Sequence, residues 1–73
     1  MAEQANELKK LATIAADLGL SAALRIQSIE LIGSIGTHDA LLALLDLAAN
    51  RELIKEERDT ALQHAREIVA SGH

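Results

Sequence analysis

Two pairs of histidine and acidic residues are the places where this sequence could carry chemistry. His38 and Asp39 are adjacent, and His64 and Glu67 are three positions apart. Imidazole and carboxylate groups act as metal ligands or as general acids and bases. A metal site needs three or four converging ligands, whereas each pair supplies two. We therefore predict no metal site and no catalytic residue, and we interpret His38 and Asp39 as the solvent-facing start of a helix.

Sequence motifs of the common enzyme classes are also missing. There is no recognisable Ser-His-Asp triad motif and no pair of catalytic carboxylates. The stretch Gly33-Ser34-Ile35-Gly36 is not a phosphate-binding loop, because no strand precedes it and no lysine follows it. We expect no enzyme activity and no cofactor.

Composition excludes further classes of function. The 73 residues carry a net charge of −4 and include no cysteine and no aromatic residue. Nucleic-acid binding needs clustered basic residues and often aromatic stacking platforms. No apolar run approaches the ~20 residues of a membrane span, and the N-terminal residues lack the apolar segment of a signal peptide. We therefore expect a cytoplasmic protein that binds no nucleic acid and has no membrane span.

The sequence predicts a single all-helical domain over residues 1–73. It has no proline and is rich in alanine, leucine and glutamate, a composition that favours helices. Ser21 and Thr37 are expected to begin helices, and Gly19 and Gly36 to follow helix ends in the left-handed conformation. Short connections favour antiparallel neighbours, as two stacked helical hairpins or as a four-helix bundle. The expected helices span about residues 3–17, 21–35, 38–50 and 55–70.

Gly33 lies inside the second expected helix, where glycine costs about 1 kcal/mol relative to alanine. We interpret it as a point where a neighbouring helix approaches closely. The last helix is expected to start within the mostly charged run RELIKEERD, residues 51–59. We interpret this run as a solvated helix start, with Glu56, Glu57 and Asp59 favoured by the helix dipole and Glu52 paired weakly with Lys55. The alternative is an electrostatic rim that selects a basic partner. The apolar stripe of the last helix is expected to comprise Leu62, Ala65, Ile68 and Val69.

Two segments of the chain resemble each other. LKKLATIAADLGLSAALR aligns with LLALLDLAANRELIKEER at an offset of 33, so that Arg25 meets Arg58. The helix that follows each segment aligns better at an offset of 36, which pairs Gly36 with Gly72 and Arg25 with Ala61. Self-similarity at such a period indicates helical repeats.

The stretch LRIQSIELIGSIG, residues 24–36, resembles the first helix of HEAT-like repeats of the short, phycobilisome-lyase type. It begins with an aliphatic-Arg pair, Leu24-Arg25, and ends with the aliphatic-Gly-x-Ile-Gly sequence of residues 32–36. The following THDALLALL is similar to the second helix of the same repeat, so the resemblance covers about one repeat, residues 21–50. Residues 3–18 and 55–72 are similar to flanking half repeats. The resemblance implies a minimal α-solenoid with no active site. It also implies that Arg25 bonds neighbouring turns or an acid of the next repeat, and Asp17 is a nearby acidic candidate.

Repeat proteins need about three stacked units and polar terminal units for stability, whereas this chain has about two. Its expected third helix is also apolar around most of its circumference. We therefore predict a non-catalytic protein-protein interaction module or small adaptor that binds another protein or forms a homo-oligomer. The resemblance allows an alternative, an accessory chaperone- or lyase-like factor for a tetrapyrrole-bearing antenna protein. The candidate interaction surface comprises Leu42, Leu45, Leu47, Arg51, Glu52 and Lys55.

Overall fold

The chain folds into four α-helices. The computed structural model describes residues 2–72 and the side chains of residues 6–72, and it contains no strand in that range. The all-helical prediction is therefore confirmed. The first and third helices each end two residues earlier than expected. The helices are α1 (Ala2–Ala15), α2 (Ala22–Ile35), α3 (His38–Ala48) and α4 (Lys55–Ala70).

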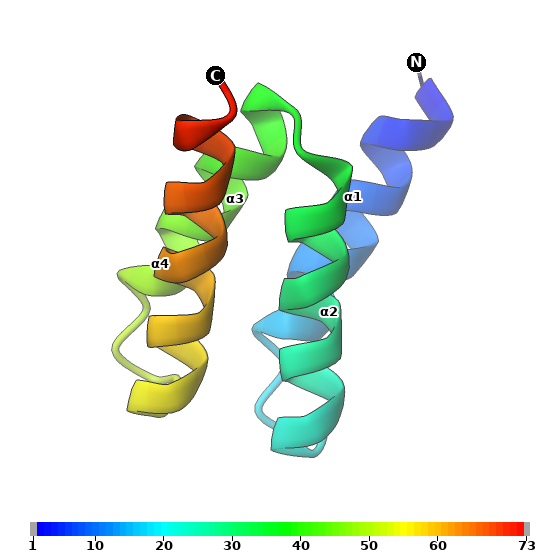
Figure 1. Ribbon diagram of the computed structural model, residues 1–73. Helices are drawn as coiled ribbons and strands as arrows, with labels where there is room; N and C mark the ends of the chain where they lie inside the picture. The colour runs from blue at the N-terminus through cyan, green and yellow to red at the C-terminus, as the bar shows by residue number, and fades with distance from the viewer. Residues whose placement is uncertain (1, 73) are drawn as a thin grey trace.

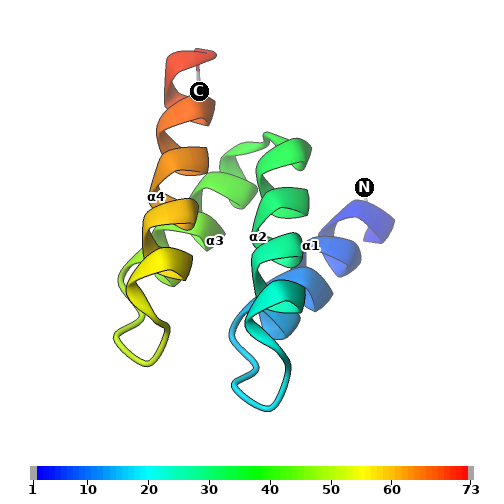
Figure 2. The same ribbon diagram turned by 60° about the horizontal axis from the view of Figure 1, so that its bottom comes forward.

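The helices form two hairpins stacked in two layers (Figure 1). α1 packs against α2 and α3 against α4. α2 and α4 lie side by side in one layer and run in the same direction, with α1 and α3 behind them, as Figure 2 also shows. Among the residues described, α1 makes no contact with α4. A closed four-helix bundle would bring the first and last helices together, so the structure is an open stack of two hairpins.

Local sequence signals define the starts of α2 and α3 and the end of α2. Ser21 Oγ accepts a hydrogen bond from the Leu24 N–H, and Thr37 Oγ1 accepts one from the Ala40 N–H, each at 3.2 Å. Both residues therefore begin helices as expected. Gly36 has φ 68°, the left-handed conformation that follows many helix ends.

Gly19 does not follow this rule, and its expected left-handed conformation is wrong. Within residues 2–72, Gly36 and Gly72 are the glycines with positive φ. The chain turns after α1 through the Asp17 side chain, whose Oδ1 accepts a hydrogen bond from the Gly19 N–H at 2.8 Å. An aspartate that bonds the backbone two residues later forms a turn without requiring a left-handed residue.

The core lies between the two layers. Ile29 and Ile32 of α2 and Leu44 of α3 are fully buried, and small residues at the helix contacts let the backbones approach closely. The apolar stripe predicted for α4 is half right. Ala65 and Ile68 are buried, whereas Leu62 and Val69 are exposed because they face the open end of the stack beyond α4. The buried alanines are Ala15, Ala40, Ala61 and Ala65.

Candidate interaction surfaces

A buried ion pair joins the two hairpins. Arg25 Nε in α2 donates to Glu57 Oε2 in α4 at 2.9 Å, and the two side chains are 10% and 0% exposed. The other carboxylate oxygen of Glu57 accepts the Ile54 N–H at 3.3 Å. Arg25 Nη1 donates to the carbonyl oxygens of Leu20 and Asp17. Both charged groups are thus paired and further hydrogen-bonded, the arrangement in which a buried ion pair is tolerated.

The sequence interpretation of this region was wrong in three respects. Glu57 is fully buried rather than solvated. It, and not the Asp17 carboxylate, is the acidic partner of Arg25. Lys55 Nζ pairs with Asp59 Oδ2 at 2.7 Å instead of with Glu52, because the i,i+4 spacing places the two side chains on one helix face. A glutamate at the third helical position is a known capping signal, but its pairing with α2 depends on the stacking of the hairpins.

Gly33 faces His64 across the contact between α2 and α4. A Cβ atom at position 33 would lie 2.6 Å from His64 Nδ1 and 3.0 Å from His64 Cβ. His64 Nδ1 is 3.2 Å from Glu67 Oε1, and the imidazole is 25% exposed. The absence of a side chain at Gly33 therefore makes room for this imidazole, and His64 packs between the hairpins.

The remaining residues that could do chemistry lie apart from one another. His38 and Asp39 are both exposed at the start of α3. Within the part of the chain whose side chains are described, no three histidine, aspartate or glutamate residues converge as metal ligands would.

Most of the candidate interaction residues are on the surface, with one exception. Leu42 is 49% exposed and Leu45 is 43% exposed. Leu47 is 4% exposed and belongs to the hydrophobic core, so its assignment to an interaction surface is wrong. Leu44 and Leu47 are three positions apart and point inward together, whereas Leu42 and Leu45 lie on the outer side of α3. The polar candidates Arg51, Glu52 and Lys55 are all exposed.

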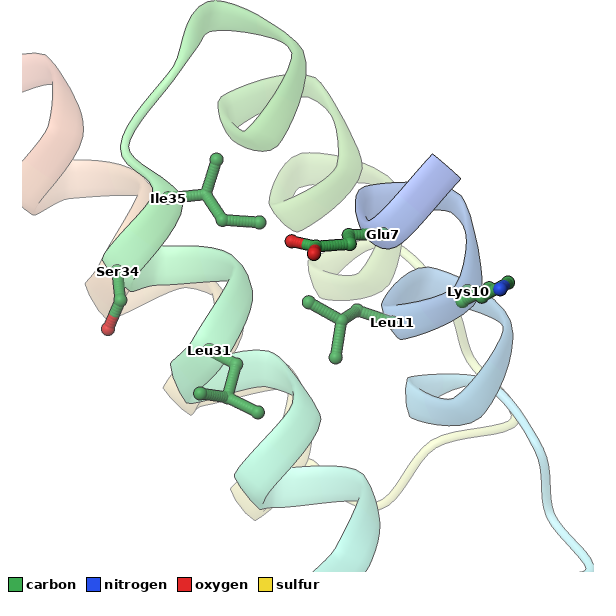
Figure 3. Close-up of a pocket in the computed structure, with 6 residues that line it drawn as sticks. All are labelled: Glu7, Lys10, Leu11, Leu31, Ser34 and Ile35. Carbon is green, nitrogen blue, oxygen red and sulfur yellow. The ribbon is translucent and has the colours of Figure 1, made fainter. Parts of the chain in front are cut away.

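One end of the stack presents a groove between α1 and α2, which we call the α1/α2 end face. The groove has a volume of about 460 Å³. Leu11, Leu31, Ile35 and Glu7 converge on the space between the two helices, whereas Lys10 and Ser34 lie at its edges (Figure 3). Leu31 is 54% exposed, although it lies in the middle of an apolar helix. This face is defined by Glu7, Lys10, Leu11, Leu31, Ser34 and Ile35.

The opposite end of the stack presents a second groove, between α3 and α4, which we call the α3/α4 end face. Its volume is about 310 Å³. Leu45, Leu62 and Val69 are 43%, 37% and 57% exposed. Arg66 is the charged residue in its lining. This face is defined by Leu41, Leu45, Leu62, Ala65, Arg66, Val69 and Ala70.

The loops within the two hairpins have the same hydrogen-bond pattern. Asp17 Oδ1 accepts the Gly19 N–H at 2.8 Å, and Asn50 Oδ1 accepts the Glu52 N–H at 2.9 Å. These two bonds lie 33 positions apart in the chain. The same spacing separates the ends of α1 and α3 and the starts of α2 and α4.

This common spacing identifies the counterpart of Arg25 in the second hairpin. Arg25 is the fourth residue of α2, and Arg58 is the fourth residue of α4. The offset of 33 therefore matches the helix starts, and the offset of 36, which pairs Arg25 with Ala61, does not. Arg58 Nε is buried, and it has no hydrogen-bond partner among the residues described.

Comparisons with known proteins give no assignment, because no family model, curated protein or solved structure matches the chain. Across residues 2–72, none of the helices combines the length and the apolar character needed to span a membrane.

Proposed function

We propose that this protein is a non-catalytic protein-protein interaction module built from two HEAT-like helical hairpins. The observation that carries the proposal is the exposed aliphatic surface at both ends of the stack. At the α3/α4 end face, Leu45, Leu62 and Val69 surround an apolar groove. Contiguous apolar surface on a small protein commonly marks a binding site.

The arrangement of the hairpins supports the end faces as the binding surfaces. Inside the chain, the face of α2 that carries Arg25, Ile29 and Gly33 is covered by α4. Shifted by 33 positions, the same face of α4 carries Arg58, Leu62 and Arg66, and Leu62 and Arg66 are exposed. Covering apolar area there would contribute about 25 cal/mol per Å² before the costs of association. A helical partner that stacks on α4 would cover the face that corresponds to the covered face of α2, with Arg66 in the place of Gly33.

Affinity capture with a matched pair of surface variants tests the proposed function. Val69→Glu places a charge on the α3/α4 end face, and Gln63→Glu places the same charge on an exposed part of α4 outside that face. We expect the wild-type chain and Gln63→Glu to retain one common bound protein and Val69→Glu to lose it. The proposal fails at this face if Val69→Glu retains the same bound protein. Light scattering of the purified chain shows whether the bound protein is a second copy.

A further inference from the structure

We propose that the α3/α4 end face binds a helix of another protein that carries a carboxylate in its first turn, placed to accept a hydrogen bond from Arg58. The inference rests on the proposed function and specifies the chemistry of the partner. Leu62 lines the groove. Arg58 is half-buried, is not part of the lining, and lies one helical turn before Leu62 on the same face of α4.

The contact between the hairpins shows what this face of a helix binds. Arg25, the fourth residue of α2, donates through Nε to Glu57, the third residue of the helix stacked on it. Glu57 can accept this bond while it also accepts the Ile54 N–H at the start of its own helix. The hydrogen bond to the start of its own helix thus holds the carboxylate of a third-position glutamate. In this position the carboxylate can also accept a hydrogen bond from an arginine of the neighbouring helix.

Arg58 has the same position in α4 as Arg25 has in α2, but no carboxylate pairs with it among the described residues. Its Nε is buried without an acceptor in the described part of the chain. A buried donor without a partner is unfavourable, and a carboxylate would satisfy the donor and neutralise the guanidinium. Arg66, two turns later, adds a second positive charge at the groove. The face therefore combines apolar side chains with two cations, and its complement is an amphipathic helix with acidic residues.

A second copy of this chain, stacked in the same way, does not supply the carboxylate. The residue of α2 that corresponds to Glu57 is Leu24, which is 47% exposed at the opposite end of the stack. Leu24 would then face Arg58 and leave its guanidinium unpaired in a newly buried contact, which is costly. Charge complementarity thus favours a different protein over a head-to-tail homo-oligomer.

Peptide titration of the full chain, followed by nuclear magnetic resonance, tests this inference. The probe is a synthetic peptide of residues 53–71 of this chain, which carries Glu57 in the sequence context that Arg25 recognises. Two control peptides carry Glu57→Gln or Glu56→Gln. They have equal net charge, but Glu56 is exposed inside the folded chain. The observed signals are the Arg58 Nε–H and the backbone amides of Leu62 and Val69.

We expect the wild-type and Glu56→Gln peptides to shift these signals with similar affinity. The Glu57→Gln peptide should bind about tenfold more weakly, because the charged hydrogen bond to Arg58 is lost. A chain with Arg58→Gln should bind all three peptides equally. The inference is overturned by equal binding of the three peptides to the wild-type chain, by shifts confined to the α1/α2 end face, or by no shift at millimolar peptide.

The peptide titration and the affinity capture distinguish failure of this inference from failure of the proposed function. If the three peptides bind alike but the captured protein is still lost with Val69→Glu, the interaction module stands and the carboxylate requirement is wrong. If the captured protein is unaffected by Val69→Glu while the peptides discriminate at Arg58, the face recognises acidic helices but is not the site used by that protein.

Discussion

The covered face of α2 and the open face of α4 carry corresponding residues in different environments. On α2, Arg25 is neutralised by Glu57, and Ile29 is fully buried. On α4, Arg58 Nε is buried without an acceptor among the described residues, and Leu62 is 37% exposed. The difference arises because α4 packs on this face of α2, whereas no helix among the described residues packs on the corresponding face of α4. The arginine that is paired between the hairpins at one position therefore has, 33 positions later, a counterpart whose Nε lacks an acceptor among the described residues.

The largest effect on stability is expected when the carboxylate that pairs with Arg25 is removed. Glu57→Ala should destabilise the fold by about 3–5 kcal/mol, because the buried Arg25 loses its counter-charge. Such a loss is a large part of the stability of a small domain. Urea unfolding followed by far-ultraviolet circular dichroism measures it, since the chain has no tryptophan or tyrosine. The control Glu56→Ala, at an exposed residue of the same turn, should change the stability by less than about 0.5 kcal/mol.

The close approach of the hairpins at Gly33 should give the next largest effect. Gly33→Ala places a Cβ 2.6 Å from His64 Nδ1, and we expect a loss of about 1–3 kcal/mol from overpacking. Gly33→Leu should cost more. In a His64→Ala background the imidazole is removed and the Cβ of residue 64 stays 3.0 Å from the new Cβ, so Gly33→Ala should cost clearly less there than in the wild-type chain. A gain in stability from Gly33→Ala in the wild-type chain would contradict the close approach.

Substitution of Gly36 tests the cost of backbone strain, because a side chain at this position would meet no close neighbour. Gly36→Ala should cost about 1–2 kcal/mol, because φ is 68° and the nearest atom to a new Cβ is 3.9 Å away. Gly19→Ala should cost less, because Gly19 has no positive φ, although its Cβ would lie 3.1 Å from Asp17 Oδ1. Thermal unfolding of the two variants compares them directly. An equal or larger loss at Gly19 would show that backbone conformation is not the deciding factor.

The smallest effect on stability is expected on the open face. Val69 is 57% exposed, so Val69→Gln should change the free energy of unfolding by less than about 0.5 kcal/mol. Ile68→Gln, at the preceding and buried position, should cost about 2–4 kcal/mol. Denaturant unfolding of this adjacent pair locates the boundary between core and open surface. Similar losses for the two variants would mean that Val69 belongs to the core.

Local sequence signals predicted much of the fold. Ser21 and Thr37 begin helices because their side chains bond the first turn, and Gly36 reverses the chain because it tolerates positive φ. Gly33 was identified as a point of close helix approach, because glycine destabilises the interior of a helix and its presence there indicates a packing constraint. Each of these signals lies within a few consecutive residues, whereas the packing partner of Gly33, His64, comes from another helix.

Stacking of the hairpins decided the features that the sequence did not reveal. Glu57 lies in a run of charged residues and is buried because Arg25, 32 positions earlier, reaches it. Leu62 and Val69 have the spacing of core residues but lie on the side of α4 that no described helix covers. Leu47 was misassigned because an almost wholly apolar helix does not indicate which side faces inward.

The most direct test of the account is the free energy of unfolding of two variants, Arg25→Ala and Arg58→Ala. We predict a loss of about 3–5 kcal/mol for Arg25→Ala, since it leaves Glu57 buried without its counter-charge. For Arg58→Ala we predict a loss below about 1 kcal/mol, because its Nε has no acceptor within the described chain. Equal losses for the two arginines would contradict the claim that Arg25 is paired inside the chain and that Arg58 Nε has no acceptor among the described residues.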